Sequence, residues 1–100
     1  MGDSVANSYI EFDYPGYWMA VDYKLELLLN DEIIRNFQFK EGVHFEIPVS
    51  KGKNKLTIKY GALGKFRAKT LVLEVSEGKT YHVQLTYSRF WGNFSLKLVD

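Results

Sequence analysis

The two histidines of this 100-residue sequence are the side chains best suited to bind a metal ion. His44 and Glu46 are two positions apart, so on a strand they would share a face and could supply two ligands. A metal site needs further ligands at a defined spacing, and the sequence indicates none. His82 stands at an outward strand position, which is typical of an ordinary polar strand residue. We therefore predict no metal site and no cofactor.

Carboxylates, hydroxyls and glycine-rich loops do not form a catalytic pattern either. Acid–base catalysis by two carboxylates needs one of them in an apolar site and the other in solvent. Asp31–Glu32 stand in a turn sequence, and Glu74 and Glu77 flank another, so we expect all four to be solvated. No serine lies in a G-x-S-x-G motif, residues 61–65 do not complete the phosphate-loop motif, and no cysteine is present. The sequence predicts a protein that is not an enzyme.

The two halves of the sequence carry opposite charge. Residues 1–50 contain nine acidic and three basic residues, a net charge of −6, whereas residues 51–100 contain three acidic and ten basic residues, a net charge of +7. One stretch without any acid holds seven of the bases: Lys51, Lys53, Lys55, Lys59, Lys65, Arg67 and Lys69. One hypothesis is that this basic stretch forms one exposed face for an anionic partner. The alternative is a solvated strand face whose lysines protect a sheet edge. Nucleic acid is disfavoured, because the pI of about 7.9 is below 9.

Aromatic residues gather at two turn sequences, around Pro15–Gly16 and beside Gly92–Asn93. Tryptophan, tyrosine and arginine dominate the energetic hot spots of protein interfaces. The candidate partner-binding residues are Tyr14, Tyr17, Trp18, Arg89, Phe90 and Trp91. The same aromatics could instead stack on a sugar, or fold back as a lid on the open end of the core.

Apolar and polar residues alternate along almost the whole sequence, as expected for strands with one face in a core. Between these runs stand turn residues such as Asn30–Asp31, which suit a tight hairpin. The alternation predicts strands over 8–13, 18–29, 32–39, 44–49, 54–60, 66–75, 79–88 and 93–99. We predict an all-β antiparallel sandwich of about seven or eight strands with negligible helix.

One predicted strand contains a conflict between its two halves. Lys65, Arg67 and Lys69 place charge at odd positions, while Leu71 and the apolar residues after it place apolar groups there. A slip of one residue exchanges the faces of a strand, so we expect a bulge, bend or break near Ala68–Leu71. In the alternative, the strand starts at Thr70 and the basic residues form a loop.

Residues 25–34, 45–58 and 71–81 each combine strand residues with a hairpin turn. Through these segments the sequence resembles the PEGA-type domains over about residues 23–87. Asn54 stands where those domains usually have histidine, and the Pro-Glu-Gly-Ala signature is absent. The resemblance implies a small β-sandwich of the immunoglobulin or transthyretin sort that serves as a surface or accessory module without catalysis.

Length and composition predict one domain over residues 1–100, with residues 1–7 as a flexible tail. No apolar run approaches the ~18 residues of a membrane-spanning helix. The start of the sequence lacks the regions of a signal peptide, from which we expect a cytoplasmic location. We predict a non-catalytic protein-interaction or accessory module whose partner is another protein or a second copy of itself. The alternative is a carbohydrate-binding module that uses the turn aromatics to bind a glycan.

Overall fold

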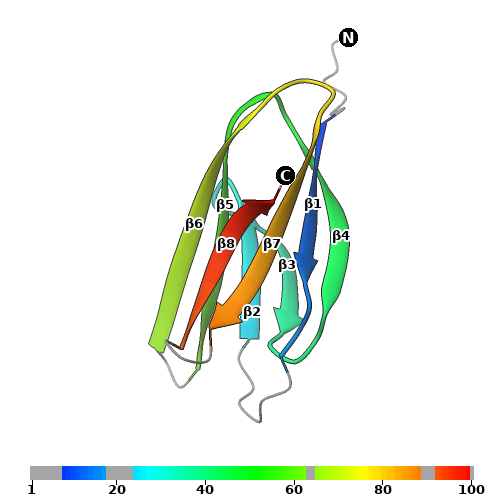
Figure 1. Ribbon diagram of the computed structural model, residues 1–100. Helices are drawn as coiled ribbons and strands as arrows, with labels where there is room; N and C mark the ends of the chain where they lie inside the picture. The colour runs from blue at the N-terminus through cyan, green and yellow to red at the C-terminus, as the bar shows by residue number, and fades with distance from the viewer. Residues whose placement is uncertain (1–7, 18–23, 63–64, 89–91, 100) are drawn as a thin grey trace.

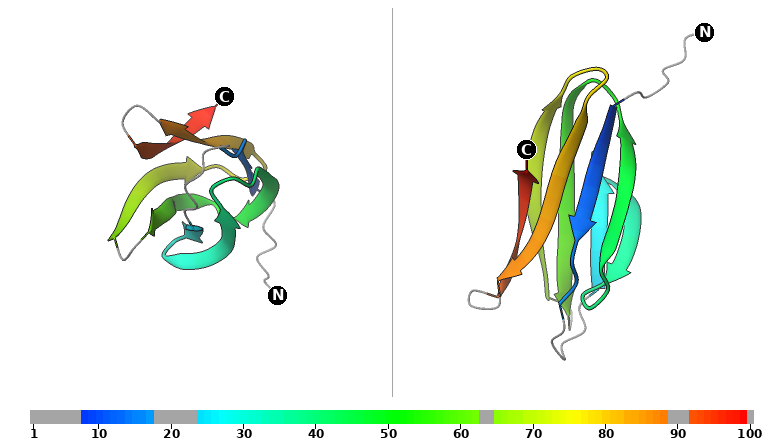
Figure 2. Two further views of the ribbon diagram at one scale, coloured as in Figure 1. Left: turned by 90° about the horizontal axis from the view of Figure 1, so that it is seen from below. Right: turned by 45° about the vertical axis from the view of Figure 1, so that its right-hand side comes forward.

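Two four-stranded sheets pack face to face in this computed structural model, which describes residues 8–17, 24–62, 65–88 and 92–99 (Figure 1). Residues 1–7, expected to be a tail, lie outside the described residues. Sheet A has the strand order β4 (Val43–Val49), β1 (Ser8–Tyr14), β7 (Thr80–Ser88) and β8 (Asn93–Val99). Sheet B has the order β3 (Glu32–Gln38), β2 (Lys24–Leu29), β5 (Gly52–Ala62) and β6 (Lys65–Val75). The view from below shows the two sheets as separate layers (Figure 2).

The structure confirms the all-β sandwich, with eight strands and no helix in the described residues. Every neighbouring pair of strands is antiparallel except β1 and β7, which are parallel. Part of the strand predicted over 18–29 forms β2, while residues 18–23 lie outside the described residues.

The β2–β3 hairpin turns at Asn30 and Asp31, as predicted. Both residues have positive φ, 51° and 70°, the backbone conformation of a type I′ turn. The Asn30 side chain also joins the hairpin to β5, because its Nδ2 donates to Asn54 Oδ1 at 2.9 Å and its Oδ1 accepts from Lys55 N at 2.8 Å. Buried Asn54 in turn donates to Ser50 O at 2.8 Å. Asn54 thus uses its amide to tie two turns to the same end of β5.

The core consists of alternate side chains from the inner faces of both sheets. In β1 the burial alternates at every residue from Ser8 to Tyr14. One end of the core is a cluster of aromatic rings around Phe94, whose ring centroid lies 4.5 Å from that of Tyr60 and 4.9 Å from that of Tyr87. The edge-to-face contact of Phe94 with Tyr60 adds stability beyond the apolar area that the rings bury.

The basic half of β6 corrects one expectation from the sequence. β6 is continuous and pairs with β5 in a single register, so the bulge or break expected near Ala68–Leu71 is wrong, and so is a strand start at Thr70. Arg67 and Lys69 occupy positions on the core side of β6 and yet stay exposed. The strand changes from basic to apolar side chains without a slip, because Arg67 and Lys69 belong to an edge strand and remain exposed on its core side. The register shift that the described residues do contain lies between β2 and β3, at Ile34.

The two faces of β2 provide a direct test of this packing. Leu27 is fully buried in the core, whereas Lys24 is exposed at the start of the same strand. We expect Leu27→Ala to lower the free energy of unfolding by about 2–5 kcal/mol, because it leaves a cavity. Lys24→Ala should change it by no more than about 0.5 kcal/mol. Urea denaturation measures both variants, and similar losses at the two positions would show that the core has been assigned to the wrong face.

Candidate functional site

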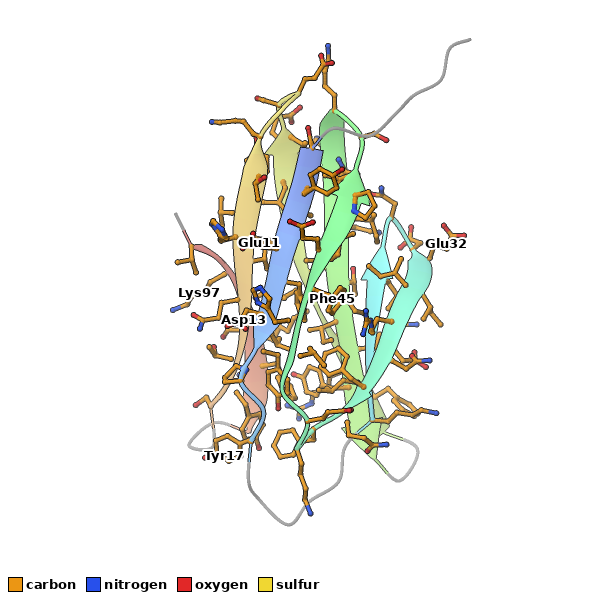
Figure 3. The ribbon with its side chains drawn as sticks, turned by 90° about the vertical axis from the view of Figure 1, so that its right-hand side faces the viewer. Glu11, Asp13, Tyr17, Glu32, Phe45 and Lys97 are labelled. Carbon is orange, nitrogen blue, oxygen red and sulfur yellow. The ribbon has the colours of Figure 1, made fainter. Side chains whose placement is uncertain are left out.

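The structure describes two of the six candidate aromatic-turn residues, and both pack against the end of the core. Tyr14 is only 1% exposed, and its hydroxyl donates to Phe39 O at 2.5 Å. Its prediction as a partner-binding residue is therefore wrong. Tyr17 is half-buried, with its ring centroid 5.6 Å from that of Phe39 and 5.1 Å from that of Tyr87 (Figure 3). The other four candidates, Trp18, Arg89, Phe90 and Trp91, lie outside the described residues.

Both histidines lie on the outer face of sheet A, each beside a carboxylate of β1. His82 Nε2 is 2.9 Å from Glu11 Oε1, and His44 Nδ1 is 3.4 Å from Asp13 Oδ1. Glu11 and Asp13 are successive residues on the outer side of β1 (Figure 3). The two carboxylate–histidine pairs border a shallow hollow of about 280 Å³. Within the described part of the chain no group of three or more histidine, cysteine or carboxylate side chains is arranged to hold a metal ion. Glu46 lies opposite Glu11 rather than beside a second histidine.

The basic stretch does not form the single face that its sequence suggested. Lys53, Lys55 and Lys59 lie on the outer face of sheet B, whereas Arg67 and Lys69 lie on the core side of β6. Antiparallel pairing causes this division, because each odd-numbered residue of β5 lies opposite an even-numbered residue of β6.

Only one base of the stretch has an acidic partner among the described residues. Lys55 Nζ forms an ion pair with Asp31 Oδ1 at 2.8 Å. Lys51 is exposed before β5, and the side chain of Lys65 lies outside the described part. Lys51, Lys53, Lys59, Arg67 and Lys69 have no acidic partner within 4 Å among the described residues.

Apolar and β-branched side chains lie side by side on the outer face of sheet B. The strand pairing places four of these side chains in one row across β3, β2, β5 and β6. A fifth, Val72, lies on β6 two positions after the member of the row on that strand. We call this group the outer patch, and it consists of Ile33, Leu28, Thr57, Thr70 and Val72. At its centre Leu28 is only 7% exposed, although it does not face the core. Ile33 and Val72 at its two ends are 52% and 54% exposed.

Sequence alternation alone did not show the outer patch, because its members come from four strands. The signal that was present is the run Leu27–Leu28–Leu29, where Leu28 breaks the alternation of apolar and polar residues. A leucine at an outward position indicates that the face around it is not wholly polar.

The outer patch ends at the free edge of β6, which is the left-hand edge of sheet B in Figure 1. With eleven residues, β6 is longer than the other edge strands, β3, β4 and β8, which have seven residues each. β3 has an irregular register at Ile34 and β4 contains Pro48, two features that hinder edge pairing. Among the described residues no backbone hydrogen bond is made from the free side of β6.

Comparison with known proteins gives no relative for this chain. No family model, no curated protein and no solved structure matches it, so the PEGA-type resemblance stays a prediction. The strand order differs from the ABED and CFG sheets of immunoglobulin constant domains. In the described residues no helix is long and apolar enough to cross a membrane.

Two buried tyrosines allow a matched test of the core end. The Tyr14 hydroxyl donates to Phe39 O, whereas the buried Tyr60 hydroxyl has no hydrogen-bond partner among the described residues. We expect Tyr14→Phe to lower the free energy of unfolding by about 0.5–1.5 kcal/mol, because it removes one buried hydrogen bond while the Phe39 carbonyl still accepts from Tyr17 N. Tyr60→Phe should cause no loss or a small gain. Equal losses in urea denaturation would contradict this assignment of the hydrogen bond.

Tyr14 also predicts a dependence of stability on alkaline pH. Burial, with a smaller contribution from Tyr87, raises the pKa of the Tyr14 hydroxyl above its ordinary value of 10.0. Above pH ~10 the unfolded chain releases this proton while the folded chain keeps it, so stability falls as pH rises, by up to about 1.4 kcal/mol per pH unit. The stability difference between wild type and Tyr14→Phe should therefore shrink between pH 9 and pH 11. A constant difference would show that burial of Tyr14 does not couple folding to its proton.

Proposed function

We propose that this chain is a non-catalytic protein-interaction module, of the accessory or assembly type, whose partner binds over the outer patch. The observation that carries the proposal is the exposure of Ile33 and Val72 at the two ends of a row of apolar and threonine side chains. Large apolar side chains that stay exposed on one face of a sheet, here at the two ends of a row whose middle residues Leu28 and Thr57 are buried, are typical of a site that another molecule covers.

The contrast between the two outer faces supports this proposal. The outer face of sheet A carries carboxylates, histidines, Gln84 and Lys97, as a face in contact with water does. The outer face of sheet B also faces solvent, yet the row of residues across its middle contains no charged side chain. β-Branched side chains such as Ile33, Thr70 and Val72 make that row flat and rigid, because their χ1 angles are restricted. A flat, rigid apolar surface loses little entropy when a protein binds to it.

The described carboxylates support a role without catalysis. Glu11 and Asp13 are partly solvent-exposed and lie beside histidines on an open face, whereas acid–base catalysis by two carboxylates needs one of them in an apolar site. The carbohydrate-binding alternative depends on the turn aromatics, of which Tyr14 is in the core and three lie outside the described residues. No feature of the described residues favours it over protein binding.

Site-specific photo-cross-linking in the producing organism tests the proposal. We replace Val72, in the outer patch, with benzoylphenylalanine, and in a second variant Glu46, on the outer face of sheet A. The expected result is one or a few adducts of discrete mass from position 72 and much weaker labelling from position 46. An adduct of twice the mass of the chain would identify a second copy as the partner.

A pair of glutamate substitutions controls for the surface involved. Ile33→Glu places a charge in the outer patch, and Val99→Glu places one on sheet A at a residue of similar exposure, 52% against 44%. Ile33→Glu should reduce the adducts from position 72 at least fivefold, while Val99→Glu should leave them unchanged. Equal labelling from positions 72 and 46, or equal effects of the two glutamates, would refute an interaction over the outer patch.

A further inference from the structure

We propose that the free edge of β6 binds an extended segment of a partner protein as an additional strand of sheet B, and that this segment alternates acidic with apolar residues. The inference rests on the proposed function and names the chemistry of the partner. Strand addition fits this edge because β6 has eleven residues in one regular register and contains no proline. Every second residue of an edge strand directs its N–H and C=O groups away from the sheet, where an added strand pairs with them.

The core side of β6 selects for acidic residues. Arg67 lies opposite Tyr60 and Lys69 opposite Ile58, yet both bases are exposed at the edge of the sandwich. Neither has an acidic partner among the described residues. A carboxylate directly across the strand pair would lie within reach of each base, and opposite charges at such positions stabilise a sheet.

The outer side of β6 selects for apolar residues at the alternate positions. Phe66, Ala68, Thr70 and Val72 follow one another along this side, and Phe66 is 69% exposed. Beside the short side chain of Ala68, a hollow of about 320 Å³ has Phe66 as its apolar wall and is bordered also by Glu26, Lys59 and Arg67. A branched apolar side chain opposite Ala68 would reach into this hollow, and it would extend the outer patch by one strand.

The same side chains disfavour a second copy of β6 at this edge. Two paired β6 strands would gather Arg67 and Lys69 of both copies on one side of the joined sheet. There the bases would repel one another or lie opposite the apolar residues Leu71 and Leu73. Bases on the core side of an edge strand are a known protection against pairing of like copies. An acidic segment removes this repulsion, so the charge of the edge favours a different chain over the same one.

A peptide with this alternation tests the proposal directly. The probe is fluorescein-Thr-Glu-Val-Glu-Val-Glu-Val-Thr-amide, with binding to the full chain measured by fluorescence anisotropy and the contacted residues by NMR amide exchange. We expect slower exchange of the β6 amides that face the free edge, and an affinity that falls several-fold as salt rises and screens the charges. Arg67→Glu combined with Lys69→Glu should weaken binding at least tenfold. Lys51→Glu with Lys53→Glu is the matched control, since it changes the net charge equally away from this edge and should change affinity less than twofold.

Two altered peptides separate strand pairing from simple charge attraction. N-methylation of alternate residues keeps the three glutamates but removes the amide donors, and replacement of each glutamate by lysine keeps the donors but reverses the charge. Both changes should abolish binding. Equal binding of the N-methylated peptide, or equal effects of the two double variants, would overturn the proposal. Arg67→Gln with Lys69→Gln repeats the test if the glutamate variant does not fold.

Failure of this inference can be told apart from failure of the proposed function. If cross-links from position 72 persist while no peptide binds at β6, the outer patch binds its partner without strand addition. If position 72 gives no cross-links, the proposed function itself is wrong.

Discussion

The antiparallel pairing of β5 with β6 determines on which face each side chain of the basic half lies. The pairs run in one register from Gly52–Val75 to Ala62–Lys65, so an odd-numbered residue of β5 always lies opposite an even-numbered residue of β6. β5 pairs on its other side with β2, which places Leu56, Ile58 and Tyr60 in the core. Once these side chains face inward, Lys53 and Lys59 must face outward, and Arg67 and Lys69 must lie on the core side of β6. The two-sided charge of the hairpin therefore follows from the burial of three side chains on β5.

Alternation predicted most of this fold because each strand has one buried face for most of its length. The alternation gave a wrong prediction for β6, where the bases Arg67 and Lys69 lie on the same side of the strand as Leu71 and Leu73. The inference of a slip assumed that a position on the core side is also covered. On an edge strand a residue can lie on the core side without being covered, since the opposite sheet can end before the strand does. The sequence reports the periodicity of a strand, but not how far its neighbours extend over it.

The candidate sites were harder to predict than the fold, since they join residues from strands distant in the sequence. The pair of Glu11 with His82 depends on the parallel register of β1 and β7, which no local motif encodes. The outer patch likewise needs the strand order of sheet B before its row can be recognised. Tyr14 is different, because it continues the inward series of Ile10 and Phe12. Extending the predicted strand by one residue would have placed it in the core.

The bases at the free edge of β6 both oppose pairing with a second copy and favour the proposed acidic segment. A long, regular edge strand beside an apolar patch is a hazard for any sandwich, because it offers both hydrogen bonds and apolar contacts to another copy. Proline or an irregular register, as on β4 and β3, blocks every incoming strand alike. Charge discriminates instead, since Arg67 and Lys69 oppose a second β6 but attract a segment that carries carboxylates at alternate positions. An edge protected only by charge therefore remains open to one class of partner, whereas the edges protected by backbone irregularity are closed to all.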